Sequence, residues 1–134
     1  MLKTYSGSCH CGAVRYEADI DLEKGTNKCN CTYCLKTRLW GAIIKPQAFR
    51  LHSGEQDLND YYKPGGAVHH VFCRHCAVRA FERGYLDVLG GDYVTINLAC
   101  LDDLDPTELA GARVTYMNGR DNDWFSPPRE TRHL

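Results

Sequence analysis

The sequence has no long hydrophobic run among its 134 residues. No apolar stretch approaches the roughly 18 residues that a membrane-spanning helix needs, and residues 1–5 lack the apolar core of a secretory signal. Both absences argue against a membrane partner and predict a cytoplasmic protein. In that reducing compartment cysteines remain free thiols, which leaves them available to bind a metal.

An excess of charge of one sign is also missing. The 16 Lys and Arg residues nearly balance the 17 Asp and Glu residues, and both signs are mixed along the chain. Because a nucleic-acid-binding domain usually presents a basic patch, this balance argues against a nucleic-acid partner. A phosphate-binding glycine loop, a helical two-histidine metal motif and a Ser-His-Asp order are absent as well.

No repeat, low-complexity tract or linker divides the chain, so we predict a single domain over residues 1–134. Its core is expected over about residues 4–117. The tail, residues 118–134, is rich in Gly, Asp, Asn, Arg and Pro and is predicted to form loops. Trp124 and Phe125 suggest that part of this tail docks onto the body.

Short strands punctuated by Gly and Pro predict a mainly β fold. Alternating or β-branched runs predict strands at residues 2–8, 13–18, 40–44, 49–53, 68–73, 80–83 and 93–99. Residues 19–27 and 84–91 are expected to form turns and loops. Helical signals are weak: residues 32–37 are expected to form one turn, and Asp105 followed by Pro106 marks the start of another.

Cysteine, in contrast, is abundant, and seven of the eight residues fall into three close clusters. The clusters are Cys9-x-Cys11, Cys29-x-Cys31-x-x-Cys34 and Cys73-x-x-Cys76. Cysteines this close do not readily form disulfides with each other, whereas a metal accepts adjacent thiolates. We therefore predict a zinc protein. A closed tetrahedral site takes four thiolates, so the remaining three would leave one coordination position open.

The distribution of the seven thiols between two zinc ions decides what each ion can do. A four-thiolate zinc is closed and contributes to folding, whereas a three-thiolate zinc keeps a position for an outside ligand. The pair Cys73 and Cys76 matches a structural zinc knuckle, and Cys9 and Cys11 form a natural second half because each pair adjoins a predicted strand. Spacing alone leaves this distribution open.

Several segments resemble the glutathione-dependent formaldehyde-activating enzyme family. The resemblance is strongest at residues 7–15 (GSCHCGAVR) and 29–34 (CNCTYC), and it continues at residues 72–76 (FCRHC) and 97–103 (NLACLDD). It covers about residues 4–105. What it implies is a β-tent fold, in which several small coiled antiparallel sheets, with short helical turns, surround a structural zinc.

The resemblance also implies two metal sites and a reaction. The ligands of the structural zinc would be Cys9, Cys11, Cys73 and Cys76, and those of a second, labile and catalytic zinc would be Cys29, Cys31 and Cys34. The implied reaction is of the carbon–sulfur lyase type, combining formaldehyde and glutathione reversibly as S-(hydroxymethyl)glutathione. One departure is Ala77, which stands where the family usually has Gly, at a position that often needs an unusual backbone angle.

Two other functions remain open. In one, both zinc ions are architectural and the chain is a non-catalytic module that binds proteins. In the other, the chain is a thiol-based metal store or redox sensor, in which Cys29, Cys31 and Cys34 lose zinc and oxidise.

Other residues near the clusters can be assigned from their positions. His10 and His75 lie inside the knuckles and are expected to point outward, and Cys100 follows an apolar strand and is expected to pack. His69 and His70 face opposite sides of a predicted strand, and His70 is the one favoured for a functional role.

The segment around the third cluster carries charge and aromatic rings. Tyr33, Lys36 and Arg38 flank Cys34 and are candidates to contact the carboxylates of a peptide thiol, although a short charged stretch is more often simply solvated. Four aromatic residues are expected in the core or in a pocket wall: Trp40, Phe49, Phe72 and Phe81.

Overall fold

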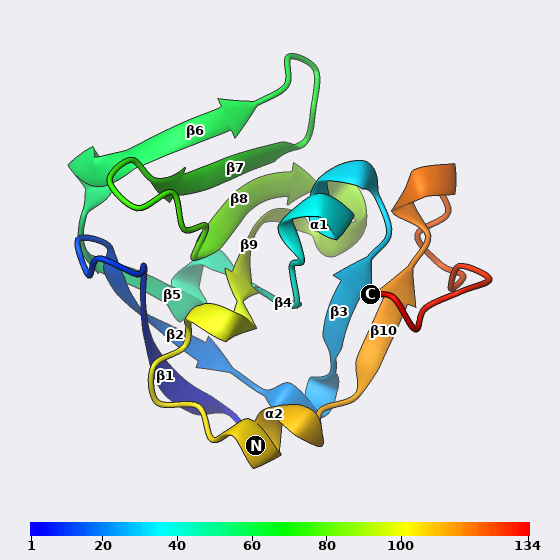
Figure 1. The fold of residues 1–134 in the computed structure, drawn as a ribbon, viewed down its shortest axis with the longest axis horizontal. Helices are drawn as coiled ribbons and strands as arrows, with labels where there is room; N and C mark the ends of the chain where they lie inside the picture. The colour runs from blue at the N-terminus through cyan, green and yellow to red at the C-terminus, as the bar shows by residue number, and fades with distance from the viewer.

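The computed structural model describes residues 1–134 and consists mainly of short β-strands in two sheets (Figure 1). The smaller sheet has the order β1-β2-β5, with β1 at Lys3–Ser8, β2 at Arg15–Ile20 and β5 at Phe49–Ser53. The larger sheet has the order β10-β3-β4-β9-β8-β7-β6. Its strands are β3 (Thr26–Cys29), β4 (Gly41–Ile44), β6 (Leu58–Tyr62), β7 (Val68–Cys73), β8 (Phe81–Leu86), β9 (Gly91–Asn97) and β10 (Val114–Met117).

The prediction of a mainly β fold of small, largely antiparallel sheets is confirmed. Neighbouring strands are antiparallel except β10 and β3, which pair in parallel. This one parallel pair forms because β10 returns to β3 from a distant part of the sequence instead of through a hairpin.

Helical structure is confined to short segments. The α-helices are α1 (Thr32–Thr37) and α2 (Pro106–Ala110). Asp105 begins α2 as predicted, since its side chain accepts a hydrogen bond of 2.8 Å from the Thr107 amide. The 3-10 turns are Leu22–Lys24, Pro46–Ala48, Glu55–Asp57, Asp87–Leu89, Leu98–Cys100 and Gly119–Asp121. None of the helices has the length and apolar character to cross a membrane.

The core lies where the two sheets meet. The alternating pattern of β2 buries Tyr16, Ala18 and Ile20 against residues of the larger sheet. The Tyr16 ring meets the Phe81 ring edge-on at 5.8 Å, and the Phe49 ring lies 4.6 Å from the same Phe81 ring. Each such side chain contributes about 1.5–3 kcal/mol by leaving water. Aromatic packing therefore joins the sheets.

Two segments that were predicted as turns or loops contain strand residues. The predicted turn at residues 19–27 instead contains the end of β2 and the start of β3, where Thr26 is buried and accepts a hydrogen bond of 2.8 Å from the Trp40 indole. The predicted loop at residues 84–91 begins inside β8. Gly84 is needed there because the Tyr93 ring of β9 lies across it and would collide with a side chain.

Part of the tail docks onto the body, as expected, but Phe125 takes no part, since it is 86 % exposed. Trp124 is 47 % exposed, and its ring lies beside Gly119 within the tail. The side-chain amide of Asn30 donates a hydrogen bond of 2.9 Å to Asn118 Oδ1, and Lys28 Nζ donates one of 3.1 Å to a main-chain oxygen of Leu134. The tail thus returns to the end of β3 (Figure 1).

Candidate metal centres

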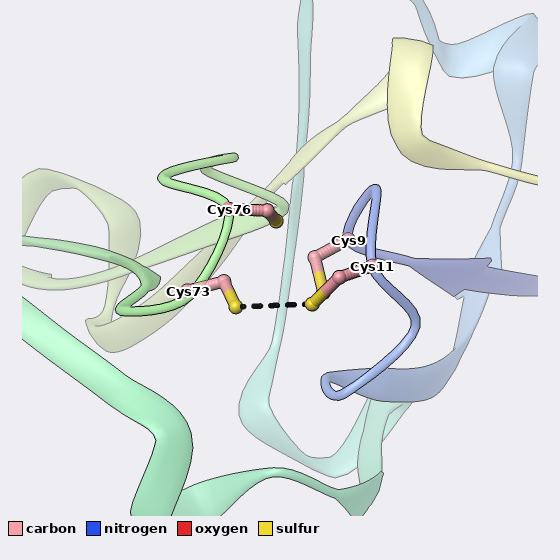
Figure 2. A group of neighbouring side chains, drawn as sticks. All are labelled: Cys9, Cys11, Cys73 and Cys76. Atoms are coloured by element: carbon pink, nitrogen blue, oxygen red, sulfur yellow. Dashed lines mark hydrogen bonds between the residues drawn. The ribbon is translucent and has the colours of Figure 1, made fainter.

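Two turns on different sheets bring four cysteines together (Figure 2). Cys9 and Cys11 follow β1, Cys73 ends β7, and Cys76 lies between β7 and β8. Their Sγ atoms lie within 4.8 Å of one another, with Cys11 Sγ 3.7 Å from Cys9 Sγ and 3.6 Å from Cys73 Sγ. Thiolates on a tetrahedral zinc, with Zn–S bonds of about 2.3 Å, are about 3.8 Å apart. This four-cysteine site could hold a metal ion, and its donors suit zinc.

The two knuckles of the four-cysteine site are closed in the same way. The Cys9 amide donates to the Val14 carbonyl at 3.1 Å, and the Cys73 amide donates to the Val78 carbonyl, also at 3.1 Å. Each hydrogen bond folds the chain back so that both sulfurs of a pair lie on one side. The Val14 amide also donates to Cys9 Sγ at 3.3 Å.

Ala77 has the unusual backbone angle that its position in the second knuckle predicts. Its φ is 64°, in the left-handed region, and its amide donates to the Cys73 carbonyl at 2.8 Å. A side chain in this region costs roughly 1–2 kcal/mol relative to ordinary backbone geometry. The second knuckle therefore retains its hydrogen bond at the expense of local strain.

Burial divides the four-cysteine site into an inner and an outer half. Cys9 and Cys73 are buried, whereas Cys11 is exposed at the surface. The histidines of the knuckles do not join the sulfurs: His10 is exposed, and His75 Nε2 lies 2.8 Å from an Asp57 oxygen. Neither histidine therefore belongs to the group of possible ligands at this site, as predicted.

The remaining cluster, Cys29, Cys31 and Cys34, is formed by the end of β3 and the start of α1. Its Sγ atoms lie within 4.8 Å of one another, and no fourth Cys, His, Asp or Glu joins them. The Cys31 amide donates to Cys29 Sγ at 3.4 Å, and the Cys34 amide donates to Cys31 Sγ at 3.3 Å. This three-cysteine site could also hold a metal ion, with thiolates stabilised by the main chain.

The three thiols of this site share their protons unequally. Hydrogen bonds from the Cys29 thiol, and next from the Cys34 thiol, lower the pKa of Cys31. The same sharing, first with Cys29 and then with Cys31, raises the pKa of Cys34. The cluster therefore stabilises a thiolate at the Cys31 position, and a cation bound there would stabilise the remaining two.

Helix α1, which carries Cys34, is clamped onto the larger sheet through Tyr33. One face of the Tyr33 ring meets the His70 ring at 3.8 Å, and the Arg79 guanidinium lies 4.6 Å from the ring centre. Arg79 Nη2 also donates a hydrogen bond of 2.5 Å to Thr37 Oγ1. Tyr33, near the start of this short helix, is thus attached to β7, and Thr37, at its end, is attached to the segment before β8.

The clamp depends on a buried ion pair. Arg79 is 7 % exposed and Glu82 is 4 % exposed, and Arg79 Nη1 donates to Glu82 Oε2 at 3.1 Å. His70 Nδ1 contacts the same carboxylate, whereas His69 pairs with Asp60 at 2.6 Å. The sequence singled out His70 and missed its two charged partners, although opposite charges within the apolar run from 78 to 82 were a usable signal.

A small cavity of about 160 Å³ lies beside the three-cysteine site. Cys29 and Cys34 line it together with the apolar side chains of Leu35, Leu39 and Trp40. Trp40, which was expected in the core or in a pocket wall, lines this cavity and also packs against the core. A larger depression of about 600 Å³ has no cysteine in its lining. Of these two cavities, only the smaller therefore adjoins a cluster of thiols.

The three residues that flank Cys34 in the sequence, Tyr33, Lys36 and Arg38, differ in whether they reach the cavity. Arg38 lines the cavity together with Lys28, whose ammonium lies 4.6 Å from the centre of the Trp40 ring. Lys36 is exposed and lies outside the lining. Tyr33 belongs to the clamp of α1 and is also absent from the lining.

Three further predictions concern packing. Phe49 and Phe81 belong to the core as expected, but Phe72 does not, because it alternates on β7 with the buried residues Val71 and Cys73. Cys100 packs against the core. Burial raises the pKa of its thiol to about 11. Its sulfur does not lie among those of either metal site.

Comparisons with known proteins agree with this geometry. The family model described as glutathione-dependent formaldehyde-activating enzyme matches residues 4–118, a range that contains all the cysteines of both sites. Among solved structures, the crystal structure of a Rhodobacter sphaeroides protein from a structural genomics programme is similar, with a TM-score of 0.68 and 25% sequence identity. That similarity covers 82% of this chain and 99% of the other.

Proposed function

The chain belongs to the glutathione-dependent formaldehyde-activating enzyme family, and we propose that it is a zinc-dependent carbon–sulfur lyase. Its substrate would be the adduct of a small thiol and an aldehyde, such as S-(hydroxymethyl)glutathione. In the forward direction the thiol sulfur bonds to the aldehyde carbon, and the thiol proton ends on the new hydroxyl oxygen. The reverse reaction breaks that carbon–sulfur bond and releases both partners.

The unequal number of sulfur ligands at the two sites carries this proposal. The four-cysteine site would saturate a tetrahedral zinc and stabilise the fold, whereas the three-cysteine site would leave one position for an outside ligand. The cavity adjoins the three-cysteine site. A wholly structural module has no use for an unsaturated site beside a cavity.

Residues around the three-cysteine site would hold and shield the reactants. Cys29, Cys31 and Cys34 would hold a zinc, which when bound supplies a Lewis acid that favours substrate thiolate and polarises an aldehyde oxygen. Leu35 and Trp40 give the cavity apolar walls, which would exclude water from the reacting atoms. Its volume of about 160 Å³ is below the roughly 300–1,000 Å³ of typical ligand pockets, so it would enclose only the reacting end of the thiol.

Elemental analysis and exchange NMR together test the proposal. The wild-type protein should bind two zinc ions and accelerate exchange between free glutathione and its formaldehyde adduct. Cys31→Ser should remain folded, retain one zinc and lose the acceleration. Cys100→Ser serves as the matched control, because this cysteine belongs to neither site. Full acceleration by Cys31→Ser would exclude the assigned site.

The same preparations separate the redox alternative. If the chain is a sensor or metal store, peroxide should oxidise the three-cysteine site and release its zinc while the wild-type protein shows no acceleration of adduct exchange. An enzyme that works in a reducing, cytoplasmic environment should show the acceleration with its thiols reduced.

A further inference from the structure

The last residues of the tail fold back onto the cavity beside the three-cysteine site. Arg38 Nη1 donates a hydrogen bond of 2.6 Å to the His133 carbonyl oxygen, and Lys28 Nζ donates one of 3.1 Å to a main-chain oxygen of Leu134. Leu134 also lines the cavity. We call residues 131–134 the strap. In Figure 1 the end of this segment lies beside β3.

The two cations that hold the strap are themselves fixed relative to the sulfurs. Lys28 directly precedes Cys29 on β3, and its ammonium is held against the Trp40 ring. Arg38 ends α1, with its amide bonded to the carbonyls of Cys34 and Leu35. Both cations therefore keep a set distance from the sulfurs of the three-cysteine site.

The partner of Arg38 in the strap is weak compared with an alternative ligand. Arg38 binds the neutral main-chain carbonyl oxygen of His133. A hydrogen bond between a charged donor and a carboxylate is roughly twice as strong as a neutral one. A carboxylate that reached both cations would therefore compete effectively with the strap.

We propose that Lys28 and Arg38 form a carboxylate-binding subsite for the thiol substrate and that the strap occupies this subsite until the thiol displaces it. The inference rests on the proposed function, because its ligand is the thiol of that reaction. A peptide thiol such as glutathione places its sulfur at the three-cysteine site and one of its carboxylates on the two cations. Binding of the thiol and docking of the strap are then mutually exclusive.

Calorimetric titration of the zinc-loaded protein tests the subsite with two probes. Glutathione carries the carboxylates, whereas glutathione diethyl ester has the same sulfur and none. Arg38→Gln should weaken glutathione binding about tenfold, since it removes a charged hydrogen bond, and should not weaken diester binding. Lys36→Gln is the matched control, because it removes a cation of the same helix that lies outside the cavity.

Removing residues 131–134 should have the opposite effect on glutathione. Without the strap the subsite is always free, so glutathione should bind about five- to tenfold more tightly. If the shortened protein does not fold, Leu134→Ser replaces it, because this change removes the side chain that lies in the cavity. Unchanged glutathione affinity in both Arg38→Gln and the strap variant would overturn the proposal.

Hydrogen exchange gives a readout independent of affinity and turnover. The Leu134 amide donates to the Thr131 carbonyl at 3.0 Å in the docked strap. Saturating glutathione should accelerate exchange in residues 131–134, and the diester should do so less. Slower exchange in this segment on glutathione binding would mean that the strap closes over the ligand, and would contradict displacement.

Failure of this inference and failure of the proposed function give different results. If wild type accelerates adduct exchange while Arg38→Gln and strap removal change neither binding nor turnover, the subsite is wrong and the function stands. If glutathione binding follows the expected pattern but no protein accelerates the exchange, the subsite stands and the function is wrong.

Discussion

The two cysteine sites use the same ligand chemistry but connect very different parts of the chain. In the four-cysteine site, the neighbouring sulfurs of Cys11 and Cys73 are 62 positions apart in sequence, and the site joins the smaller sheet to the larger one. The three-cysteine site is contained within residues 29–34. Cross-linking distant segments removes more conformational freedom from the unfolded chain than a local link does. From this difference in connectivity we expect a metal at the four-cysteine site to stabilise the fold and one at the three-cysteine site to exchange more readily.

The surroundings of the two sites reinforce this difference. Inner cysteines of the four-cysteine site, Cys9 and Cys73, belong to the hydrophobic core itself. The three-cysteine site borders a cavity and depends for its position on the clamp that holds α1. Loss of a metal should therefore damage the whole fold at one site and only local structure at the other.

The largest expected effect comes from Cys73→Ser. A structural zinc contributes an apparent binding free energy of about 10–16 kcal/mol, whereas a domain is stable by only about 5–15 kcal/mol. Cys73→Ser should therefore lose cooperative thermal unfolding, measured by circular dichroism, whereas Cys31→Ser should retain it. The contrast between the sites fails if the Cys73→Ser protein melts within a few degrees of wild type.

Next in size is Glu82→Gln, which tests the clamp. It leaves the buried Arg79 guanidinium without its counter-charge, at a cost of about 3–5 kcal/mol in the free energy of unfolding. Urea denaturation measures this change. Glu55→Gln is the control, because Glu55 and Arg83 form an exposed pair at 3.5 Å that should contribute under about 1 kcal/mol. Equal effects of the two changes would rule out a structural role for the buried pair.

Gly119→Ala should disturb the three-cysteine site and the tail ring beside it. A Cβ atom at Gly119 would lie 2.5 Å from Cys29 Sγ and 2.7 Å from the Trp124 ring, so that sulfur and that ring must move. We expect the affinity for the second zinc to fall about tenfold, measured by competition with a chelator, while the melting temperature changes little. Gly111→Ala is the control, because its nearest neighbours beyond the adjoining residues are 3.5 Å away or farther. Unchanged affinity in Gly119→Ala would show that the tail does not support the site.

The smallest expected effect is a gain at the four-cysteine site. Ala77→Gly should relieve the left-handed strain at φ 64° and raise stability by about 1 kcal/mol, after allowance for the greater freedom of glycine in the unfolded chain. The corresponding rise in melting temperature is about 2–5 °C by calorimetry. A lower melting temperature would mean that the methyl group contributes packing that outweighs the strain.

Features of short range in the sequence were predictable. Close-set cysteines indicate metal sites because their spacing disfavours mutual disulfides and allows shared coordination. The start of α2 at Asp105 and the strained angle at Ala77 also depend only on adjacent residues. Alternating apolar residues likewise indicated β2, whose buried face follows the pattern.

Features that depend on distant neighbours were missed or wrong. The strand β10 exists because it pairs with β3, and Gly84 lies in a strand because a ring from β9 covers it. The clamp of α1 joins Tyr33, His70 and Glu82 from separate elements, so no local pattern reveals it. Part of the tail docks as expected, but Phe125, whose apolar ring suggested this, takes no part.

The amino-acid sequence by itself determined which thiols are candidates to bind a metal. Cysteines separated by one or two residues lie close together in any fold that the chain adopts. Only the tertiary structure decided how those pairs combine, because the sulfurs that meet across the two sheets are brought together by long-range strand pairing and burial. It also placed Lys28, Arg38 and the strap on one cavity, a juxtaposition that no local interaction specifies.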